Sequence, residues 1–377
     1  MNLRERTQQH LAIIEQHGLW RKLKSPSAEM IDLSSNDYLG LANDDRLKSA
    51  MIAEIERTGC GSTGSRLLRG ERAIFTRAEN CFAEFKKTER ALFFGSGYGA
   101  NIGVLTAFLE PGDVVFSDEF NHASLIDGIR LSKAKRIIFP HNDEQALGKL
   151  IKENPCQGQR FLVVESLFSM DGDIAPLNEY GGLCREYNVA LIIDEAHAVG
   201  VFGEQGSGLI EEYGIEQDVF LSINTAGKAL GVSGAFAAGA AWAIELLIQR
   251  SRPFIFSTAP TPAVCAALIE AIEIVKQEPN RRAKLLELSR FLRESLCENE
   301  IVVSMQNSQI VPIVIGASER AVMIANELQA NGFDVRAVRP PTVPENTARL
   351  RISLNSDLNE HLLLDFVRSL KSALLSN

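Results

Sequence analysis

The chain has 377 residues, 45% hydrophobic and 23% charged, and this ordinary globular composition excludes a disordered, collagen-like or coiled-coil protein. Its formal net charge is −9 and it lacks long basic runs, which argues against nucleic acid or an acidic membrane surface as a partner. The length predicts one large domain and a smaller one.

The predicted elements begin with a helix over 3–19 and an extended stretch at 30–35. Short apolar runs then alternate with longer helical patterns. These runs cover 91–94, 113–117, 136–139, 161–165, 190–194, 219–223 and 235–239. Continuous hydrophobicity within such runs is typical of strands buried on both faces. We therefore predict an α/β large domain with a mostly parallel seven-stranded sheet.

The C-terminal part has a different pattern. Helical periodicity covers 262–277 and 280–298, and Pro279 should interrupt it. Strands are expected at 301–304, 310–315, 333–338 and 349–354, with helices between and after them, which predicts a smaller α+β domain. The expected organisation is an N-terminal helix and arm over 1–40, a large domain over 41–275 and a C-terminal domain over 276–377.

The six cysteines are scattered and none forms a C-x-x-C pair, so neither a disulfide framework nor a cysteine metal site is expected. The histidines likewise lack metal-ligand spacing, so no metal is predicted. Scattered cysteines, a polar N-terminus and the lack of a bilayer-length apolar run favour a cytoplasmic protein without a membrane partner.

Polar residues follow three of the predicted strands. Asp194 ends the run at 190–194, Ser169 lies just past the run at 161–165, and Lys228 lies in the glycine-bounded loop NTAGKALG after the run at 219–223. Ligands of open parallel sheets bind beyond the carboxyl ends of the strands. We therefore expect these three side chains at one edge of the sheet.

Lys228 has no charged neighbour in its loop. Desolvation should depress the pKa of such a lysine, and a neutral amine can form a Schiff base with a carbonyl. The alternative is a lysine whose stem packs while its head reaches water. Asp194, with His197 soon after it, favours the first interpretation, because a buried aspartate can keep the pyridine nitrogen of pyridoxal phosphate protonated. Asp194 could instead cap the next helix.

The loop GSGYGAN at 95–101 follows a predicted strand and precedes a helix, as a phosphate-binding helix N-terminus requires. The same letters match G-x-G-x-x-A, with Asp118 after the next strand, so a nicotinamide-dependent dehydrogenase is the rival interpretation. That reading gives Lys228 and Asp194 no role. A cofactor-binding but inactive scaffold protein is a third possibility, which the intact lysine and aspartate disfavour.

Two further features could belong to a site. His122 follows the run at 113–117, where its ring could stack on a cofactor or simply cap a helix. Near the C-terminus, Arg349 and Arg351 alternate on a predicted strand and should share one face. Arginine is the preferred bidentate partner of a carboxylate, although an edge strand with salt bridges would explain these charges equally.

Taken together, these stretches resemble the α-oxoamine synthases, which are pyridoxal-phosphate enzymes of the aspartate-aminotransferase-like fold type I. The resemblance runs from about residue 19 to the C-terminus. It is carried by nine stretches: SSNDYLGL (34–41), GSTGSRLLRG (61–70), SGYGAN (96–101), FNHASLIDG (120–128), ESLFSMDGD (165–173), DEAHAVGVFGEQGSG (194–208), TAGKALGVSGA (225–235), FSTAPTPA (256–263) and RPPTVPENTARLRIS (339–353). The last is most similar to the biotin-pathway branch of the family.

The resemblance implies a role for each matching residue. Lys228 would bond to pyridoxal phosphate, Asp194 would pair with its ring nitrogen, and His122 would stack on the ring. Further cofactor contacts are implied for Gly97, Tyr98, Ser169, His197, Thr225 and, across a homodimer interface that shares the active sites, Thr258. Substrate contacts are implied for Arg351 and Asn36 at the amino acid carboxylate and for Arg21 and Thr342 at the acyl chain.

The implied activity is a decarboxylating condensation of L-alanine with a pimeloyl thioester of coenzyme A or acyl carrier protein, a step of biotin biosynthesis. The rivals within the family are a glycine C-acetyltransferase and a serine palmitoyltransferase-like enzyme. Arg21 favours pimeloyl, because an acetyl donor has no distal carboxylate for it to meet.

Overall fold

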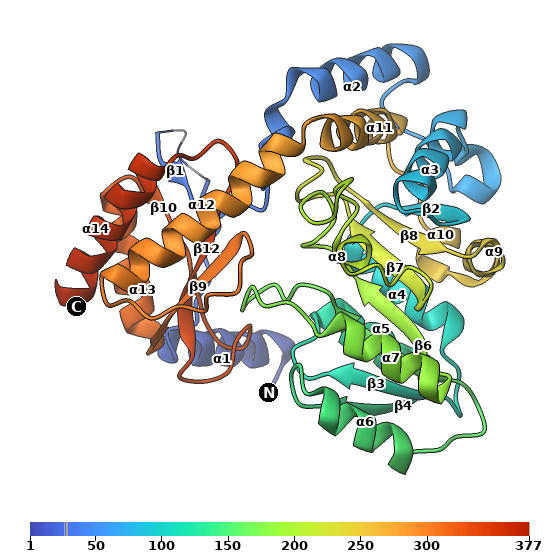
Figure 1. The fold of residues 1–377 in the computed structure, drawn as a ribbon, viewed down its shortest axis with the longest axis horizontal. Helices are drawn as coiled ribbons and strands as arrows, with labels where there is room; N and C mark the ends of the chain where they lie inside the picture. Colours follow the sequence, from blue (N-terminus) through green and yellow to red (C-terminus); the bar gives the residue numbers. More distant parts are fainter. Residues whose placement is uncertain (26, 28, 377) are drawn as a thin grey trace. The chain divides into compact units, whose positions relative to one another are not determined.

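The computed structural model describes residues 1–25, 27 and 29–376 (Figure 1). These residues form two compact units. The large unit comprises Asp37–Ser169 and Asp173–Ala283, and the small unit comprises Met1–Asn36, Met170–Gly172 and Lys284–Asn377. Helix α12 (Pro279–Glu298) contains the boundary between them.

The large unit is built on a seven-stranded sheet with the order β2-β8-β7-β6-β5-β3-β4. Its strands are β2 (Arg90–Phe94), β3 (Val114–Asp118), β4 (Lys135–Phe139), β5 (Arg160–Glu165), β6 (Ala190–Asp194), β7 (Val219–Thr225) and β8 (Ala235–Gly239). Only β8 runs antiparallel to its neighbours β2 and β7, and the other pairs are parallel. The predicted mostly parallel seven-stranded sheet is therefore confirmed.

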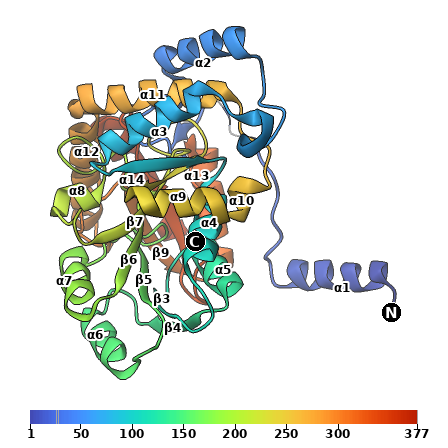
Figure 2. The same cartoon turned by 90° about the vertical axis from the view of Figure 1, so that its right-hand side faces the viewer.

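Helices connect the strands from β2 to β7, as parallel pairing requires. The connecting helices are α4 (Gly97–Phe108), α5 (Ala123–Ser132), α6 (Glu144–Glu153), α7 (Leu177–Tyr187) and α8 (Leu209–Tyr213). Helices α2 (Asp45–Thr58) and α3 (Ala73–Phe85) precede β2, and α9 (Ala241–Arg250), α10 (Arg252–Ile255) and α11 (Pro262–Gln277) follow β8. Both views show α11 beside α2 (Figures 1 and 2).

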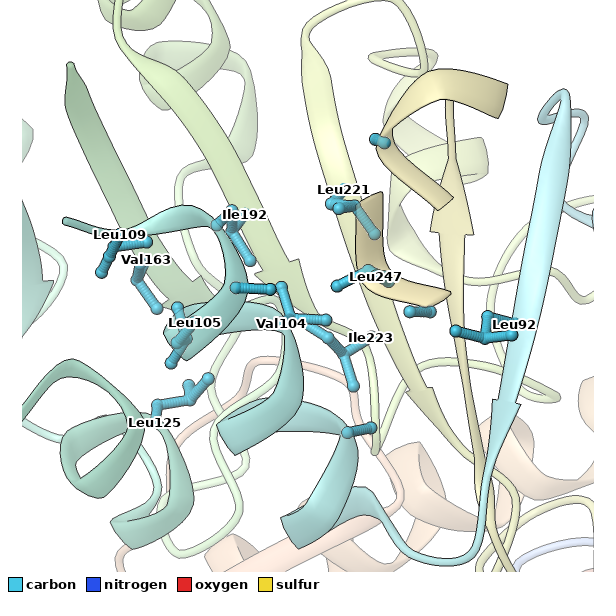
Figure 3. Close-up of a cluster of buried hydrophobic side chains, with 14 of the residues drawn as sticks. Leu92, Val104, Leu105, Leu109, Leu125, Val163, Ile192, Leu221, Ile223 and Leu247 are labelled. Atoms are coloured by element: carbon cyan, nitrogen blue, oxygen red, sulfur yellow. The ribbon is translucent and has the colours of Figure 1, made fainter. Parts of the chain in front are cut away.

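Hydrophobic side chains are buried on both faces of the sheet. Leu92 and Phe94 of β2 belong to a cluster with side chains of α4, including Val104, and of neighbouring strands (Figure 3). Phe93, between them, points to the opposite face and contacts Phe236, which stacks on Phe82 of α3. Because strands covered on both faces cannot alternate apolar with polar residues, they appear in the sequence as continuous apolar runs.

The small unit contains two short sheets. β9 (Ile310–Gly316), β12 (Ala348–Ser353) and β11 (Ala337–Val338) form an antiparallel sheet, and β1 (Ile31–Asp32) pairs parallel with β10 (Phe333–Asp334). The helices that lie wholly within this unit are α1 (Leu3–Gln16), α13 (Ser318–Ala330) and α14 (Glu360–Ser376). None of the helices described is long and apolar enough to cross a membrane.

Two strand predictions in this unit are wrong. Residues 301–304 are not a strand, because the run has little buried surface: Ile301 is buried, but Val302 is 90% exposed. The single strand expected at 333–338 is divided into β10 and β11, because these segments pair with different strands, β1 and β12. The helix expected over 3–19 ends at Gln16.

Candidate active site

The carboxyl ends of three adjacent strands bring polar residues together in the large unit. Glu165 ends β5 and is the register partner of Asp194, which ends β6, and Asp194 is in turn the partner of Ile223 on β7. Thr225 ends β7, and Lys228 follows it by three residues. The sheet therefore presents two carboxylates, a hydroxyl and an amine at one edge.

Lys228 is the last member of a short row of hydrogen-bonding groups. Its Nζ lies 2.8 Å from Nε2 of His197, and Nδ1 of His197 lies 2.6 Å from Oη of Tyr38. Tyr38 is fully buried and His197 is only 5% exposed. Tyr38 belongs to the stretch SSNDYLGL, but no pattern in the sequence assigns it a role.

Asp194 is buried and its carboxylate is held by two amide donors. Oδ2 accepts from Nδ2 of Asn101 at 2.8 Å, and Oδ1 accepts from the backbone N–H of Ala196 at 2.9 Å. The second bond caps the turn that follows β6, which is close to the capping role considered from the sequence. Asn101 is a missed residue, since it lies on α4 and only the fold brings it to β6. These donors stabilise the ionised carboxylate that a protonated pyridine nitrogen requires.

His122 is the N-cap of α5, so the helix-capping alternative is part of its role. Its Nδ1 accepts from the backbone N–H of Ser124 at 3.2 Å and lies 2.7 Å from Oγ of that residue. Burial lowers the pKa of His122, and the charge of Lys228 lowers it further. The Asp194 carboxylate acts in the opposite direction. The neutral ring, accepting at Nδ1, carries its proton on Nε2, which is thereby a hydrogen-bond donor.

Glu165 is the third residue of the site, after Tyr38 and Asn101, that the sequence analysis did not assign. Its Oε1 accepts from the backbone N–H of His122 at 2.6 Å, and the side chain is buried. Burial, followed by the nearby Asp194 charge, raises the pKa of Glu165 to about 8, although Lys228 and the His122 N–H act in the opposite direction. Glu165 therefore holds a proton near neutral pH, next to the hydrogen-bonded carboxylate of Asp194.

The N-terminus of α4 forms the candidate phosphate site. Ser96 caps the helix by accepting from the N–H of Gly99 at 3.0 Å. A Cβ on Gly97 would lie 2.3 Å from Oγ1 of Thr225, so only glycine leaves that hydroxyl in place beside the helix end. Tyr98, the next residue, donates its hydroxyl to Asp127. Free N–H groups at a helix N-terminus favour an anion.

Two other predicted cofactor residues lie near these elements. Thr258 is exposed and lines a small cavity together with Ser96 and Gly99 of the α4 end. Ser169 follows β5 by four residues and is half-buried.

The predicted substrate residues lie in the small unit. Arg21 and Thr342 line one cavity of about 830 Å³. The basic side chains around this cavity are Arg21, Lys22, Lys24, Arg336 and Arg339, and none of the described lining residues is acidic. Arg336 is paired with Asp334 at 2.7 Å. Its charge suits an anionic ligand.

Arg351 lies on β12, two residues after Arg349, as predicted. Arg349 forms an ion pair with Asp171, whereas Arg351 is buried and donates to Oγ of Ser353 at 2.5 Å. Asn36 lies a few residues after β1. Leu33, which directly follows β1, accepts at its carbonyl from the N–H of Ser353 at 2.9 Å. Arg351 and the segment leading to Asn36 are therefore linked through Ser353.

The large-unit residues fit pyridoxal phosphate. A helix N-terminus with a threonine hydroxyl suits its phosphate, the Asp194 carboxylate suits its ring nitrogen, and the Lys228 amine suits its aldehyde. The dinucleotide interpretation fits less well, because Asp118 is bound to His141 at 2.9 Å and accepts from the N–H of Asn142 at 3.0 Å. Over the described part of the chain, no three His, Cys, Asp or Glu side chains are grouped as metal ligands.

Comparisons with known proteins agree with this geometry. The family model described as aminotransferase class I and II matches residues 28–370. The 8-amino-7-oxononanoate synthase of Lysinibacillus sphaericus is 40% identical over 363 residues, which cover 93% of each chain.

Two solved structures have the same fold. A serine palmitoyltransferase with pyridoxal phosphate has a TM-score of 0.93 at 26% identity, covering 99% of this chain and 98% of the other. The 8-amino-7-oxononanoate synthase of Francisella tularensis has a TM-score of 0.80 at 29% identity, covering 92% and 98%. The chain therefore belongs to the class I and II aminotransferase family of pyridoxal-phosphate enzymes, in the group of the 8-amino-7-oxononanoate synthases.

Proposed function

We propose that this enzyme condenses L-alanine with a pimeloyl thioester, releasing carbon dioxide and the free thiol and giving 8-amino-7-oxononanoate for biotin biosynthesis. The observation that carries the proposal is the group of Lys228, Asp194 and the α4 N-terminus at one sheet edge, in a chain 40% identical to a synthase of this reaction. In this reaction a carbon–carbon bond joins the alanine α-carbon to the pimeloyl carbonyl carbon, and the thioester bond breaks.

When bound, pyridoxal phosphate withdraws electrons from the α-carbon of the amino acid. We assign the movement of the α-carbon proton to the Lys228 amine, acting as general base. Asp194 would balance the positive charge of the ring nitrogen, and Asn101 and the Ala196 N–H hold that carboxylate in its ionised form.

His122 would stabilise the negative charge that develops on the thioester oxygen. Its Nδ1 is engaged with Ser124, and its Nε2 carries the proton. Because burial lowers the pKa of His122, the ring remains a neutral donor at physiological pH. Neutral donors that are already in place stabilise an oxyanion without reorganisation.

The small unit would bind the two substrates. Arg351 and Asn36 are assigned to the alanine carboxylate, since a buried arginine is a bidentate partner for that group. Arg21 and Thr342 are assigned to the acyl chain. The basic cavity that they line supports this assignment, because pimeloyl ends in a carboxylate and its carrier is also anionic.

Substrate comparison tests the proposal. The holoenzyme is mixed with alanine, glycine or serine and with pimeloyl-CoA, pimeloyl-acyl carrier protein, acetyl-CoA or palmitoyl-CoA, and thiol release is followed. We expect the fastest release with alanine and a pimeloyl thioester, and none from Lys228→Ala. Faster release with glycine and acetyl-CoA, or with serine and palmitoyl-CoA, would contradict the proposal.

We further propose a cytoplasmic homodimer in which Thr258 contacts the partner's cofactor phosphate. Thr258 is exposed, and the N–H of Ala259 next to it donates to Gly64 at 2.9 Å. The surface around these residues includes Leu68 and Phe256, which are 84% and 69% exposed. Exposed apolar side chains of this size favour an interface. The six cysteines, none of which forms a disulfide, agree with a reducing compartment. Light scattering at micromolar concentration would show the dimer mass.

A further inference from the structure

The hydrogen bonds of the row Tyr38–His197–Lys228 can run in either of two directions, and the direction affects the protonation state of Lys228. A neutral imidazole has one N–H, so either Nδ1 or Nε2 carries the proton. If Nε2 carries it, the ring donates to the lone pair of a neutral Lys228 amine, which lies 2.8 Å away. If Nδ1 carries it, Nε2 accepts from a charged ammonium. The site of the ring proton therefore favours one protonation state of the lysine.

Tyr38 is held where it can select between these arrangements. Asp37, just before it, accepts from the N–H of Leu41 at 2.9 Å and from the N–H of Ala42 at 3.1 Å, which fixes the turn around Tyr38. The phenol is fully buried, and its Oη lies 2.6 Å from Nδ1 of His197.

This turn packs directly on the Lys228 loop. The N–H of Gly231 donates to the Lys228 carbonyl at 2.8 Å, and a Cβ on Gly231 would lie 2.6 Å from the backbone N of Ala42. The positive φ of Gly231 adds to this requirement for glycine. Neither segment can shift without disturbing the other, so the phenol and the amine keep a fixed separation with His197 between them.

We propose that Tyr38 is a positioning residue that donates its hydroxyl to Nδ1 of His197, holds the ring proton on Nε2 and so favours the neutral, nucleophilic form of Lys228. This inference rests on the role of Lys228 in the proposed function. A lysine must be neutral to attack the carbonyl of its cofactor, and the donor arrangement supplies that form without a mobile base.

Other charged groups also act on Lys228. These are Glu165 at the end of β5, Asp194 at the end of β6 and His122 at the start of α5, and the charge of Lys228 influences the pKa values of Glu165 and His122. All three remain in a Tyr38→Phe variant, which removes only the hydroxyl. A change in the titration of Lys228 is then assigned to the phenol.

The first test measures the capture of pyridoxal phosphate by cofactor-free protein, followed by absorbance as a function of pH. Loss of the hydroxyl should move the midpoint of the capture rate upward by about one pH unit, so that capture is about tenfold slower below both midpoints. Tyr180→Phe is the matched control, because Tyr180 is fully buried on α7 and its hydroxyl has no hydrogen-bond partner among the described residues. Superimposable profiles of wild type and Tyr38→Phe would overturn the proposal.

A second measurement does not require the Tyr38→Phe variant, because it is made on the wild-type protein. Imidazole ¹⁵N shifts of the cofactor-free wild-type protein report which nitrogen of His197 carries the proton, with the signal assigned through His197→Gln. The proton should be on Nε2, and a proton on Nδ1 would overturn the proposal. Neither test uses an acyl substrate. A failure of the alanine–pimeloyl assignment would therefore leave these results unchanged, and a failure here would leave the substrate assignment unaffected.

Discussion

Replacing Glu165 with glutamine tests whether Glu165, next to Asp194 at the sheet edge, holds a proton near neutral pH. Glutamine has the shape of the protonated glutamate and can still accept from the His122 N–H through its carbonyl oxygen. The substitution removes the titration while it preserves the packing. The cofactor-free protein is the appropriate sample, because a bound cofactor would change the charge near Asp194.

The magnitude follows from the difference between the folded and unfolded pKa values. Burial and the Asp194 charge raise the pKa of Glu165 to about 8 from its ordinary value of 4.5. Between these pH values the folded state holds a proton that the unfolded state has released. The contribution is therefore fully present below pH 4.5 and is lost as the pH rises through about 8. Each pKa unit corresponds to about 1.4 kcal/mol, so the change from about pH 5.5 to 7.5 is about 3 kcal/mol.

The assay is urea denaturation of both proteins at several pH values, followed by circular dichroism. The wild type should lose about 3 kcal/mol relative to Glu165→Gln over this interval. Glu56→Gln, which changes an exposed glutamate, is the matched control and should follow the wild type. If the curves of wild type and Glu165→Gln are parallel, Glu165 is already ionised in the folded protein and its pKa is not raised by burial.

Three further predictions concern the phosphate site, the loop support and the substrate. Gly97→Ala should lower affinity for pyridoxal phosphate by about tenfold or more, since the new Cβ would displace the Thr225 hydroxyl. A titration of cofactor-free protein measures this affinity, and an unchanged value would contradict the assignment of the α4 N-terminus as the phosphate site. His141 is bound by Asp118 and Asp173, and these hydrogen bonds outweigh burial to raise the pKa of His141 from 6.5 to about 10. His141→Gln should therefore lower the free energy of unfolding by about 1–3 kcal/mol at neutral pH. In urea denaturation, the difference from wild type should shrink as the pH rises toward 10. A difference that does not change with pH would refute the charged state of His141. Arg351→Ala should raise KM for alanine at least about tenfold and leave KM for the thioester nearly unchanged in steady-state kinetics, whereas equal effects on both would remove the carboxylate assignment.

The main sheet could be predicted from the sequence because burial on both faces leaves a strong local signal. Each of the seven strands is a continuous apolar run between helical patterns, and the structure shifts their ends by at most a few residues. The small unit was harder to predict. The apolar run that begins at Ile301 resembles a strand locally, but no described strand pairs with it and Val302 is 90% exposed. Strand partners are a tertiary property that apolar runs do not reveal.

The candidate site divides in the same way. Asp194 and Lys228 could be singled out because each follows a buried strand, and parallel strand ends converge. Tyr38 and Asn101 could not, since their partners His197 and Asp194 are distant in the sequence and only the fold brings them together. Glu165 had an available signal, a carboxylate that ends the apolar run FLVVE, but its raised pKa depends on burial beside Asp194.

The central claim is that Lys228 bonds covalently to pyridoxal phosphate at this sheet edge. The most direct measurement is borohydride reduction of the purified holoenzyme followed by mass spectrometry of its peptides. We expect the added mass of the reduced cofactor on the peptide containing Lys228. L-Alanine, added before the reduction, should lower the amount of this modified peptide. Cofactor mass on a different lysine, or none after incubation with pyridoxal phosphate, would contradict the account.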